Sequence, residues 1–450
     1  MRIRHFLLGI ALGLAAAATP AHAEDPHVVV ISIDGLPGFY IDDPKAELPN
    51  LRGLIARGAV AKGGMAVSNP SVTWPNHTTM MTGLHPASHG VIYNGVIERG
   101  GVDLPTKTDA AKSQKELTPV PLLFDILKEA GKTSAAINWP CTRDSKSIDD
   151  NMPDVPGMLE STTPRLKQDL ELAGLLEGFS RANARSHDQV WAEATCRVLR
   201  ERKPALTVLH VLNLDSTHHA NGPSTEAGYD AARFADGLVG RVLESIEAAG
   251  LGDSTTVFVV SDHGFIGVTA SLRPNVALRR AGLLEVDDKG SITKARAQVI
   301  PEGGIGLVYL SNPETAREDA AAVRKLFEGA TGIAAVVGPE EFGRYNLPDP
   351  AGYGPMADMI LACKPGFSIA GASAGEDDLI PQAKMTGSHG YLSTEPAMNA
   401  TFIAAGPAIK PGRAIEGIRN VDLAPTVMKI LGVPLSRADG RVLDEILAKP

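Results

Sequence analysis

Five short apolar runs, most of them followed by a loop and a helical pattern, constrain the fold of this chain more than any other feature. They are rich in β-branched residues and nearly continuously apolar, as strands covered on both faces are. The runs are HVVVISID (27–34), TSAAINW (133–139), ALTVLHVLNLD (205–215), STTVFVVSD (254–262) and NATFIAAG (399–406). Helical patterns lie between them, at 121–130 and 229–249, and after the last of them, at 421–431. This alternation predicts an α/β fold with a mostly parallel sheet sandwiched by helices.

The alternation breaks in the segment 274–382. Two strand candidates there, at 304–310 and 332–337, flank a helical pattern at 313–330, and a stretch rich in glycine and proline follows. We expect this segment to form a smaller α+β cap. The catalytic core would then comprise residues 24–273 and 383–450.

The first 23 residues have the pattern of a secretory signal peptide. A basic start, MRIR, precedes a short apolar run at 6–18, and AHA at 21–23 matches an A-x-A cleavage site before Glu24. The alternative is an uncleaved anchor, but the apolar run is shorter than the roughly 20 residues needed to span a bilayer. We therefore expect an exported protein, periplasmic or secreted, without a membrane span after cleavage.

The charge of the chain disfavours one class of partner. Loss of Arg2 and Arg4 with the signal peptide would change the formal net charge from −9 to −11. Such acidity argues against a nucleic-acid binder that works by phosphate neutralisation. It does not exclude an anionic small molecule, because bound metal ions reverse the local field. The three cysteines allow at most one internal disulfide.

Three of the apolar runs end in a carboxylate. These are Asp34, Asp215 and Asp262; His263 follows the last directly, and His219 comes four residues after Asp215. One such carboxylate alone could simply cap the next helix. Parallel strands, however, bring their carboxyl ends to one edge of the sheet, where open α/β sheets bind ligands. Three carboxylates there would repel one another unless a cation lay between them.

The residue types around this edge suit a transition metal. Mixed aspartate and histidine ligands are typical of zinc, with manganese and iron as alternatives. His389, in the sequence GSHGY, adds one more candidate ligand. The glycines on both sides of it allow close backbone approach.

Thr73 lies in the unusual segment NPSVTWPNHTTMMTGL (69–84). Pro75 suits the first turn of a helix, which places Thr73 at the helix N-terminus. Taken alone, the segment favours an ordinary N-cap role for Thr73. The alternative uses the same geometry, because free N–H groups and the helix dipole attract a phosphate. A metal ion beside the hydroxyl would lower its pKa and make it a nucleophile.

Together these motifs resemble the nucleotide pyrophosphatase/phosphodiesterase branch of the alkaline phosphatase superfamily. The matching pieces occur in the order of that family. They are SIDG (32–35), SVTWPNHTTMMTGLHPASHGVIYN (71–94), DSTHHANGP (215–223), SDHG (261–264), GSHGY (387–391) and the closing stretch 406–432. The resemblance therefore spans nearly the whole chain after the signal peptide. It implies an alkaline phosphatase-like core with two zinc ions per chain.

The resemblance also implies a role for each candidate residue. One zinc ion would be held by Asp34, Thr73, Asp262 and His263, and the other by Asp215, His219 and His389. Thr73 would be the nucleophile, and Asn94 would help to hold a non-bridging phosphate oxygen. The protein would then be a hydrolase that cleaves phosphodiester or pyrophosphate bonds of small molecules through a phosphothreonine intermediate.

Several alternatives stay open. His218 stands where the family usually has glycine, so it is a second candidate ligand or a substrate contact, although the spacing favours His219. The same core also serves phosphomonoesterases and phosphonate hydrolases such as phosphonoacetate hydrolase. The sequence has no arginine near Thr73 that would clamp a doubly charged monoester, which favours diesters. A non-catalytic metal- or nucleotide-binding protein is less favoured, since all ligands and the nucleophile are present. The oligomeric state is not indicated.

Other polar residues have simpler interpretations. We expect His77 to lie in the helix after Thr73 and to orient it by hydrogen bonds. His210 would be a core residue. Asp230 and Asp236 would lie on a polar helix face.

Overall fold

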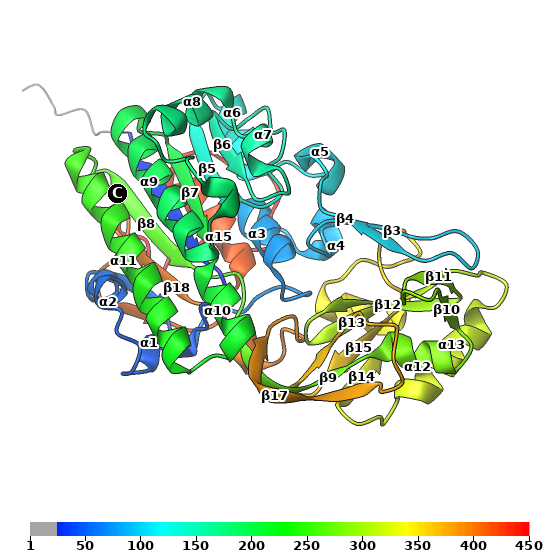
Figure 1. Ribbon diagram of the computed structural model, residues 1–450. Helices are drawn as coiled ribbons and strands as arrows, with labels where there is room; N and C mark the ends of the chain where they lie inside the picture. The colour runs from blue at the N-terminus through cyan, green and yellow to red at the C-terminus, as the bar shows by residue number, and fades with distance from the viewer. Residues whose placement is uncertain (1–24, 450) are drawn as a thin grey trace, which may run out of the picture.

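The computed structural model describes residues 25–449 (Figure 1). The predicted signal peptide, residues 1–23, lies outside the described residues. Across the part of the chain that is described, no helix is both long enough and apolar enough to cross a membrane. Cys141, Cys196 and Cys363 are all buried free thiols.

The main sheet has eight strands, in the order β19-β2-β18-β8-β1-β7-β5-β6. Along the chain they are β1 (His27–Ile33), β2 (Gly58–Ala61), β5 (Ser134–Trp139), β6 (Asp150–Pro153), β7 (Leu206–Val211), β8 (Thr255–Val260), β18 (Phe402–Ala405) and β19 (Arg413–Ile415). The five strands from β8 to β6 are parallel to one another. β18 is antiparallel to β8 and β2. This sheet confirms the predicted α/β fold class.

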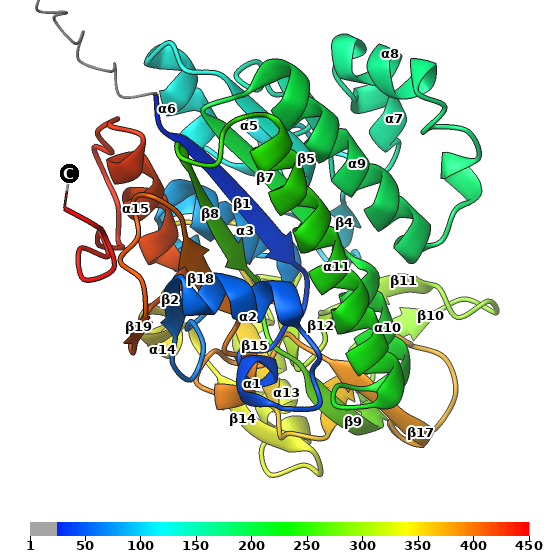
Figure 2. The ribbon, with the colours of Figure 1, turned by 90° about the vertical axis from the view of Figure 1, so that its left-hand side faces the viewer.

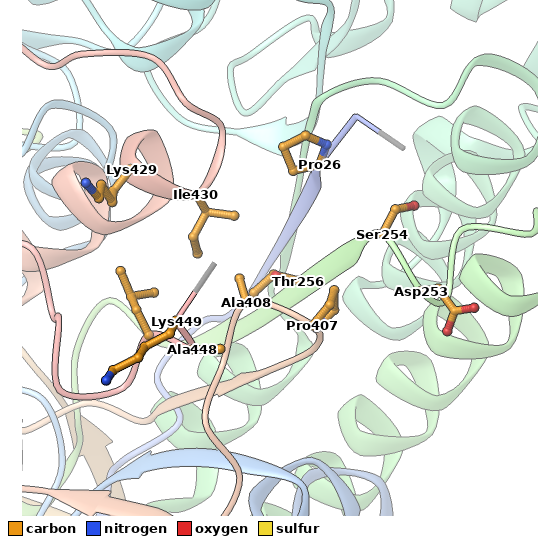
Figure 3. A pocket seen from close by; sticks show the side chains of 11 residues that line it. Pro26, Asp253, Ser254, Thr256, Pro407, Ala408, Lys429, Ile430, Ala448 and Lys449 are labelled. Atoms are coloured by element: carbon orange, nitrogen blue, oxygen red, sulfur yellow. The ribbon is translucent and has the colours of Figure 1, made fainter. Parts of the chain in front are cut away.

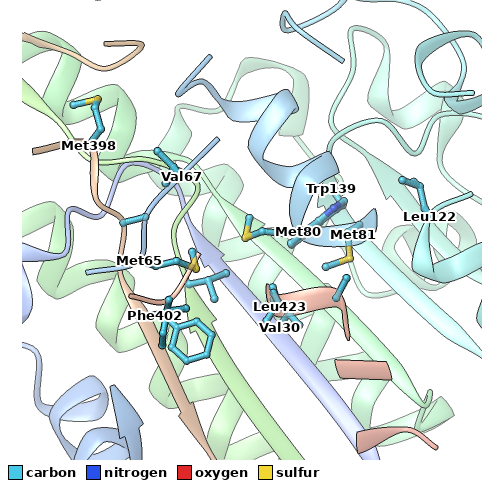
Figure 4. Close-up of a cluster of buried hydrophobic side chains, with 14 of the residues drawn as sticks. Val30, Met65, Val67, Met80, Met81, Leu122, Trp139, Met398, Phe402 and Leu423 are labelled. Carbon is cyan, nitrogen blue, oxygen red and sulfur yellow. The ribbon is translucent and has the colours of Figure 1, made fainter. Parts of the chain in front are cut away.

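Helices cover both faces of the sheet because side chains alternate along each strand. On β1, Val30 packs on one face with Met80 and Leu423 (Figure 4), whereas Val29 and Ile31 belong to the cluster on the other face. The first face carries α3 (Thr73–Thr82), α6 (Leu123–Glu129) and α15 (Leu423–Ile430). The second carries α2 (Pro49–Ala56), α9 (Ala184–Arg202) and α11 (Glu226–Ala248), which Figure 2 shows in front of the strands.

A second group of elements lies beside the main sheet (Figure 1). It contains a four-stranded sheet of β12 (Ala297–Glu302), β13 (Ile305–Leu310), β15 (Met359–Cys363) and β14 (Ile333–Val337), with α12 (Pro274–Arg280) and α13 (Ala316–Phe327). A three-stranded sheet joins β16 (Phe367–Ile369), β9 (Ile266–Leu272) and β17 (Leu379–Ser388). The proposed boundary between residues 382 and 383 falls inside β17, so the division into core and cap stays a prediction.

Shorter elements complete the fold. They are α1 (Phe39–Asp42), α4 (Pro86–His89), β3 (Val96–Glu98), β4 (Lys107–Asp109), α5 (Gln114–Leu117), α7 (Met158–Ser161), α8 (Pro164–Leu172), α10 (Asn213–Asn221), β10 (Leu284–Val286), β11 (Ile292–Ala295) and α14 (Pro339–Phe342). Of these, α10 matters most for the site.

The prediction that the third apolar run stays extended as far as Asp215 is wrong. The strand ends at Val211, and α10 begins at Asn213, so Asp215 lies in the first turn of a helix. The buried carboxylate of Asp188 explains the change of direction. It accepts hydrogen bonds from the backbone N–H groups of Leu212 (2.8 Å) and Asn213 (3.0 Å), which satisfies donors that a helix start leaves free.

Asp236 is also not the solvent-facing residue that its helix pattern predicts. Its side chain is buried and accepts the backbone N–H groups of Asn50 (3.1 Å) and Leu51 (2.8 Å), together with the Asn50 side-chain amide. These donors belong to the first turn of α2, so Asp236 caps a neighbouring helix. Asp230, in contrast, lies on the surface and pairs with Arg185 and Arg233.

Candidate active site

The six predicted aspartate and histidine ligands meet at one edge of the main sheet. Asp34 directly follows β1, the Asp262–His263 pair follows β8, and His389 follows β17. Asp215 and His219 project from α10, which starts two residues after β7. The structure brings them together as two groups that could each hold a metal ion, Asp34 with Asp262 and His263, and Asp215 with His219 and His389.

The first group is completely buried. The Nε2 atom of His263 lies 3.3 Å from Oδ1 of Asp34 and 3.2 Å from Oδ2 of Asp262. Burial, together with the carboxylates of Asp262 and Asp215, raises the pKa of Asp34 well above its usual range. A cation between the carboxylates would remove this repulsion.

The second group is more open. Oδ1 of Asp215 lies 3.4 Å from Nε2 of His219 and 3.8 Å from Nε2 of His389. The His219 side chain is 44% exposed, so this side of the site faces solvent. The rings of His389 and His263 stack with centroids 3.7 Å apart, which places the two groups side by side.

Hydrogen bonds turn the three histidines so that Nε2 faces the carboxylates. The Nδ1–H of His219 donates to the Gly387 carbonyl oxygen (3.2 Å), and that of His389 donates to the Ser71 carbonyl oxygen (3.1 Å). The Nδ1–H of His263 donates to the Gly264 carbonyl oxygen (3.1 Å). A carbonyl oxygen only accepts, so in the neutral ring Nε2 keeps its lone pair for a metal ion.

Burial keeps two of these rings neutral. It lowers the pKa of His263 to about 4 and that of His389 to about 3. Neutral imidazole is the form that binds metal ions.

Four atoms of these groups are buried without a hydrogen-bond partner among the described residues. They are Asp34 Oδ1, Asp215 Oδ1, Asp262 Oδ2 and His263 Nε2. Buried polar atoms are nearly always paired, because an unpaired one loses its solvation without compensation. These atoms are also the ones that approach one another within each group. Their donor chemistry therefore fits two metal ions.

Thr73 is the first residue of α3 and is not the N-cap. Val72 occupies the cap position, and its side chain has no acceptor to offer. The Thr73 carbonyl accepts a hydrogen bond from Nδ1–H of His77 (2.8 Å), whose Nε2 in turn accepts one from the Ser32 hydroxyl (2.9 Å). His77 thus fixes the backbone of Thr73 against β1, the strand that precedes Asp34.

Asn94 lies next to the same helix start. Its Oδ1 accepts a hydrogen bond from the backbone N–H of Trp74 (2.8 Å). Because the oxygen is engaged, the amide NH₂ group is the part left to donate to a ligand.

His218 and His210 are both buried beside the site. Nδ1–H of His218 donates to the Gly35 carbonyl oxygen (3.2 Å), and its Nε2 accepts from the Tyr40 hydroxyl (2.9 Å). With both nitrogens engaged, His218 is left without a free ligand atom. His210 has a role that sequence reasoning missed, since its Nε2 lies 2.9 Å from Oδ2 of Asp34 and fixes that carboxylate. A polar residue inside the apolar run TVLHV was the available signal.

Asp154 is the second residue that sequence reasoning missed. It directly follows β6, and its Oδ2 accepts a hydrogen bond from Nε1–H of Trp74 (3.0 Å). The polar sequence DNMP (150–153) does not predict a strand, so the pattern carries no signal for Asp154.

A cavity of about 460 Å³ lies at the opposite end of the strands (Figure 3). Pro26 and Ser254, which precede β1 and β8, line it together with residues near the C-terminus such as Lys429 and Lys449. None of the predicted site residues lines this cavity.

The fold and the two ligand groups define an α/β protein with a candidate two-metal site at the carboxyl edge of its sheet. Residues 28–392 match the family described as Type I phosphodiesterase / nucleotide pyrophosphatase. The chain belongs to this family, as its motifs predict.

Several relatives agree with this assignment. Ectonucleotide pyrophosphatase/phosphodiesterase family member 3 of Rattus norvegicus is 22% identical over 92% of this chain and 43% of its own length. An uncharacterised pyrophosphatase/phosphodiesterase of Schizosaccharomyces pombe is 23% identical over 92% of this chain and 78% of its own. Bis(5'-adenosyl)-triphosphatase of Xenopus laevis is 22% identical over 92% and 79%. The chain thus spans less than half the length of some relatives.

A solved structure shares the fold. Inactive murine ectonucleotide pyrophosphatase/phosphodiesterase 5, determined in complex with AMP, superposes with a TM-score of 0.69 at 19% sequence identity. The match covers 94% of this chain and all of that one.

Proposed function

We propose that this chain is an exported hydrolase that uses two zinc ions and cleaves phosphodiester or pyrophosphate bonds of small molecules through a phosphothreonine intermediate. The observation that carries the proposal is the set of four buried, unpaired ligand atoms in two adjoining groups. Family membership supports the reaction class.

The residues at the site divide into two ligand sets. Asp34, Thr73, Asp262 and His263 would hold one ion, and Asp215, His219 and His389 the other. When bound, two zinc ions would supply positive charge that lowers the pKa of a nearby hydroxyl or water and neutralises phosphate oxygens.

The residues of the chain perform the remaining steps. The Thr73 hydroxyl loses its proton to solvent, and its oxygen attacks phosphorus in line while the bond to the leaving oxygen breaks. The first product departs with that oxygen, which takes up a proton from solvent. Water then attacks the phosphothreonine, which releases the second product and returns a proton to Thr73. The Asn94 NH₂ group donates to a non-bridging oxygen, assisted by the positive end of the α3 dipole. His77 and His210 hold Thr73 and Asp34 in place.

Export rests on the signal-peptide pattern before Glu24. Amino-terminal sequencing of the mature protein tests it, because cleavage after Ala23 leaves Glu24 as the first residue. A mature chain that still begins at Met1 would contradict export with cleavage.

A side-by-side assay tests the reaction. Purified protein would be incubated with bis(p-nitrophenyl) phosphate, p-nitrophenyl phosphate, a dinucleoside polyphosphate, glycerophosphocholine and phosphonoacetate, while its zinc content is measured. We expect turnover of the diester or the polyphosphate to exceed that of the monoester, with two zinc ions per chain. Turnover of phosphonoacetate alone would favour the phosphonate hydrolase alternative, and a folded protein without metal would contradict the proposal.

A further inference from the structure

Asp154 contacts Trp74, the residue that follows the proposed nucleophile, although the proposed mechanism gives it no part. Its backbone N–H donates to the Trp139 carbonyl oxygen (3.2 Å), so it stands at the carboxyl edge of the sheet like the metal ligands. Its Oδ2 accepts the indole N–H of Trp74, and the backbone N–H of Trp74 donates to Asn94. Trp74 is the residue after Thr73, so one side chain separates the Asp154 carboxylate from the start of α3.

The Asp154 carboxylate differs from the neighbouring carboxylates in its partners. The ion pairs of Asp34, Asp215 and Asp262 within the described residues are all to histidines. No lysine or arginine among those residues pairs with Asp154, whose side-chain hydrogen bond goes to Trp74.

We propose that Asp154 determines specificity by disfavouring phosphate groups that carry two negative charges. This inference rests on the proposed function. A phosphate monoester carries close to two charges above its second pKa of about 6, whereas a diester carries one. A fixed carboxylate near the non-bridging oxygens therefore makes binding less favourable for the monoester than for the diester. Repulsion of the wrong substrate is a general route to specificity.

A purely structural role is the competing explanation, since Asp154 also holds the Trp74 indole. Asp154→Asn separates the two roles, because the asparagine Oδ1 still accepts the indole N–H while the charge is lost. Trp74→Phe does the reverse, because it removes the indole N–H and leaves the carboxylate in place.

The test measures kcat/KM for bis(p-nitrophenyl) phosphate and p-nitrophenyl phosphate at pH 8. In Asp154→Asn, the ratio of kcat/KM for the monoester to kcat/KM for the diester should rise by roughly five- to tenfold, as expected for the loss of one charge in a partly exposed site. Binding of inorganic phosphate, followed by calorimetry, should strengthen by a similar factor. Asp144→Asn is the matched control, because it removes an exposed carboxylate from the loop after β5 and should leave both quantities unchanged.

An unchanged ratio and unchanged phosphate binding in a zinc-loaded Asp154→Asn protein would overturn the inference. So would a Trp74→Phe variant that shifts the ratio as much as the loss of charge does. Asp154→Ser, also neutral and able to accept a hydrogen bond, takes its place if the asparagine variant does not fold. A wild-type protein that binds zinc and phosphate but cleaves neither ester would contradict the proposed function, while the calorimetry would still test Asp154.

Discussion

Thr73→Ala is expected to lower kcat for a phosphodiester by roughly 10⁴-fold or more, the scale seen when a nucleophile is removed. The substitution deletes the only atom of residue 73 that can form a covalent bond to phosphorus in the proposed mechanism. The hydrogen bond from His77 goes to the backbone carbonyl of Thr73, so it survives the change. Zinc content should fall little, because Asp34, Asp262 and His263 all remain.

Thr73→Ser is the matched control, since it restores the hydroxyl on a smaller side chain. It should keep a substantial part of the activity, and acid-quenched mass spectrometry should find a phosphoryl group on residue 73 in the wild type and not in the alanine variant. Full turnover by the zinc-loaded alanine variant would rule out the covalent route and favour direct attack by water.

The sheet and its functional edge were predictable because buried parallel strands have a recognisable, continuously apolar sequence pattern. The runs around Val30 and Val208 are apolar on both faces, since both faces are covered. The carboxylates that follow β1 and β8 then had to meet at one edge. A single run does not reveal at which residue its strand ends. The strand before Asp215 ends early because Asp188, from α9, supplies the acceptors that start α10.

The supporting residues were harder to predict because their roles depend on partners far away in sequence. His210 acts on Asp34, 176 residues earlier, and Asp154 on Trp74, 80 residues earlier. His210 is only one polar residue within its run, and Asp154 follows a strand that the sequence does not predict. Asp236 shows the same limit, since the helix pattern does not reveal that a second helix start is packed against it. The division of the ligands into two groups was likewise predicted only from the family resemblance and not from the residue pattern.

Removal of metal is expected to abolish turnover and to lower the melting temperature, and both should return with added zinc. Without a cation, the carboxylates of Asp34, Asp215 and Asp262 stay close together in a site where one oxygen of each has no hydrogen-bond partner among the described residues. A ligand that binds only the folded state stabilises it by about 4 kcal/mol at a thousandfold excess over its Kd. Removal of two such ions should therefore lower the melting temperature by more than several degrees. Differential scanning calorimetry with and without chelator measures this difference.

Single-ligand variants sharpen this test. His389→Ala removes a ligand of the second group alone and should reduce zinc from two ions per chain to one. His187→Ala is the control for metal content, because that ring lies on α9, hydrogen-bonds to the Phe179 carbonyl oxygen (2.8 Å) and packs against Phe179 and Trp191, away from the site. The control should keep both ions. A chelated protein with unchanged stability and full activity would show that the unpaired atoms of the two groups are not metal ligands. That result would also contradict the proposed role of Thr73, because the role depends on a metal ion beside its hydroxyl.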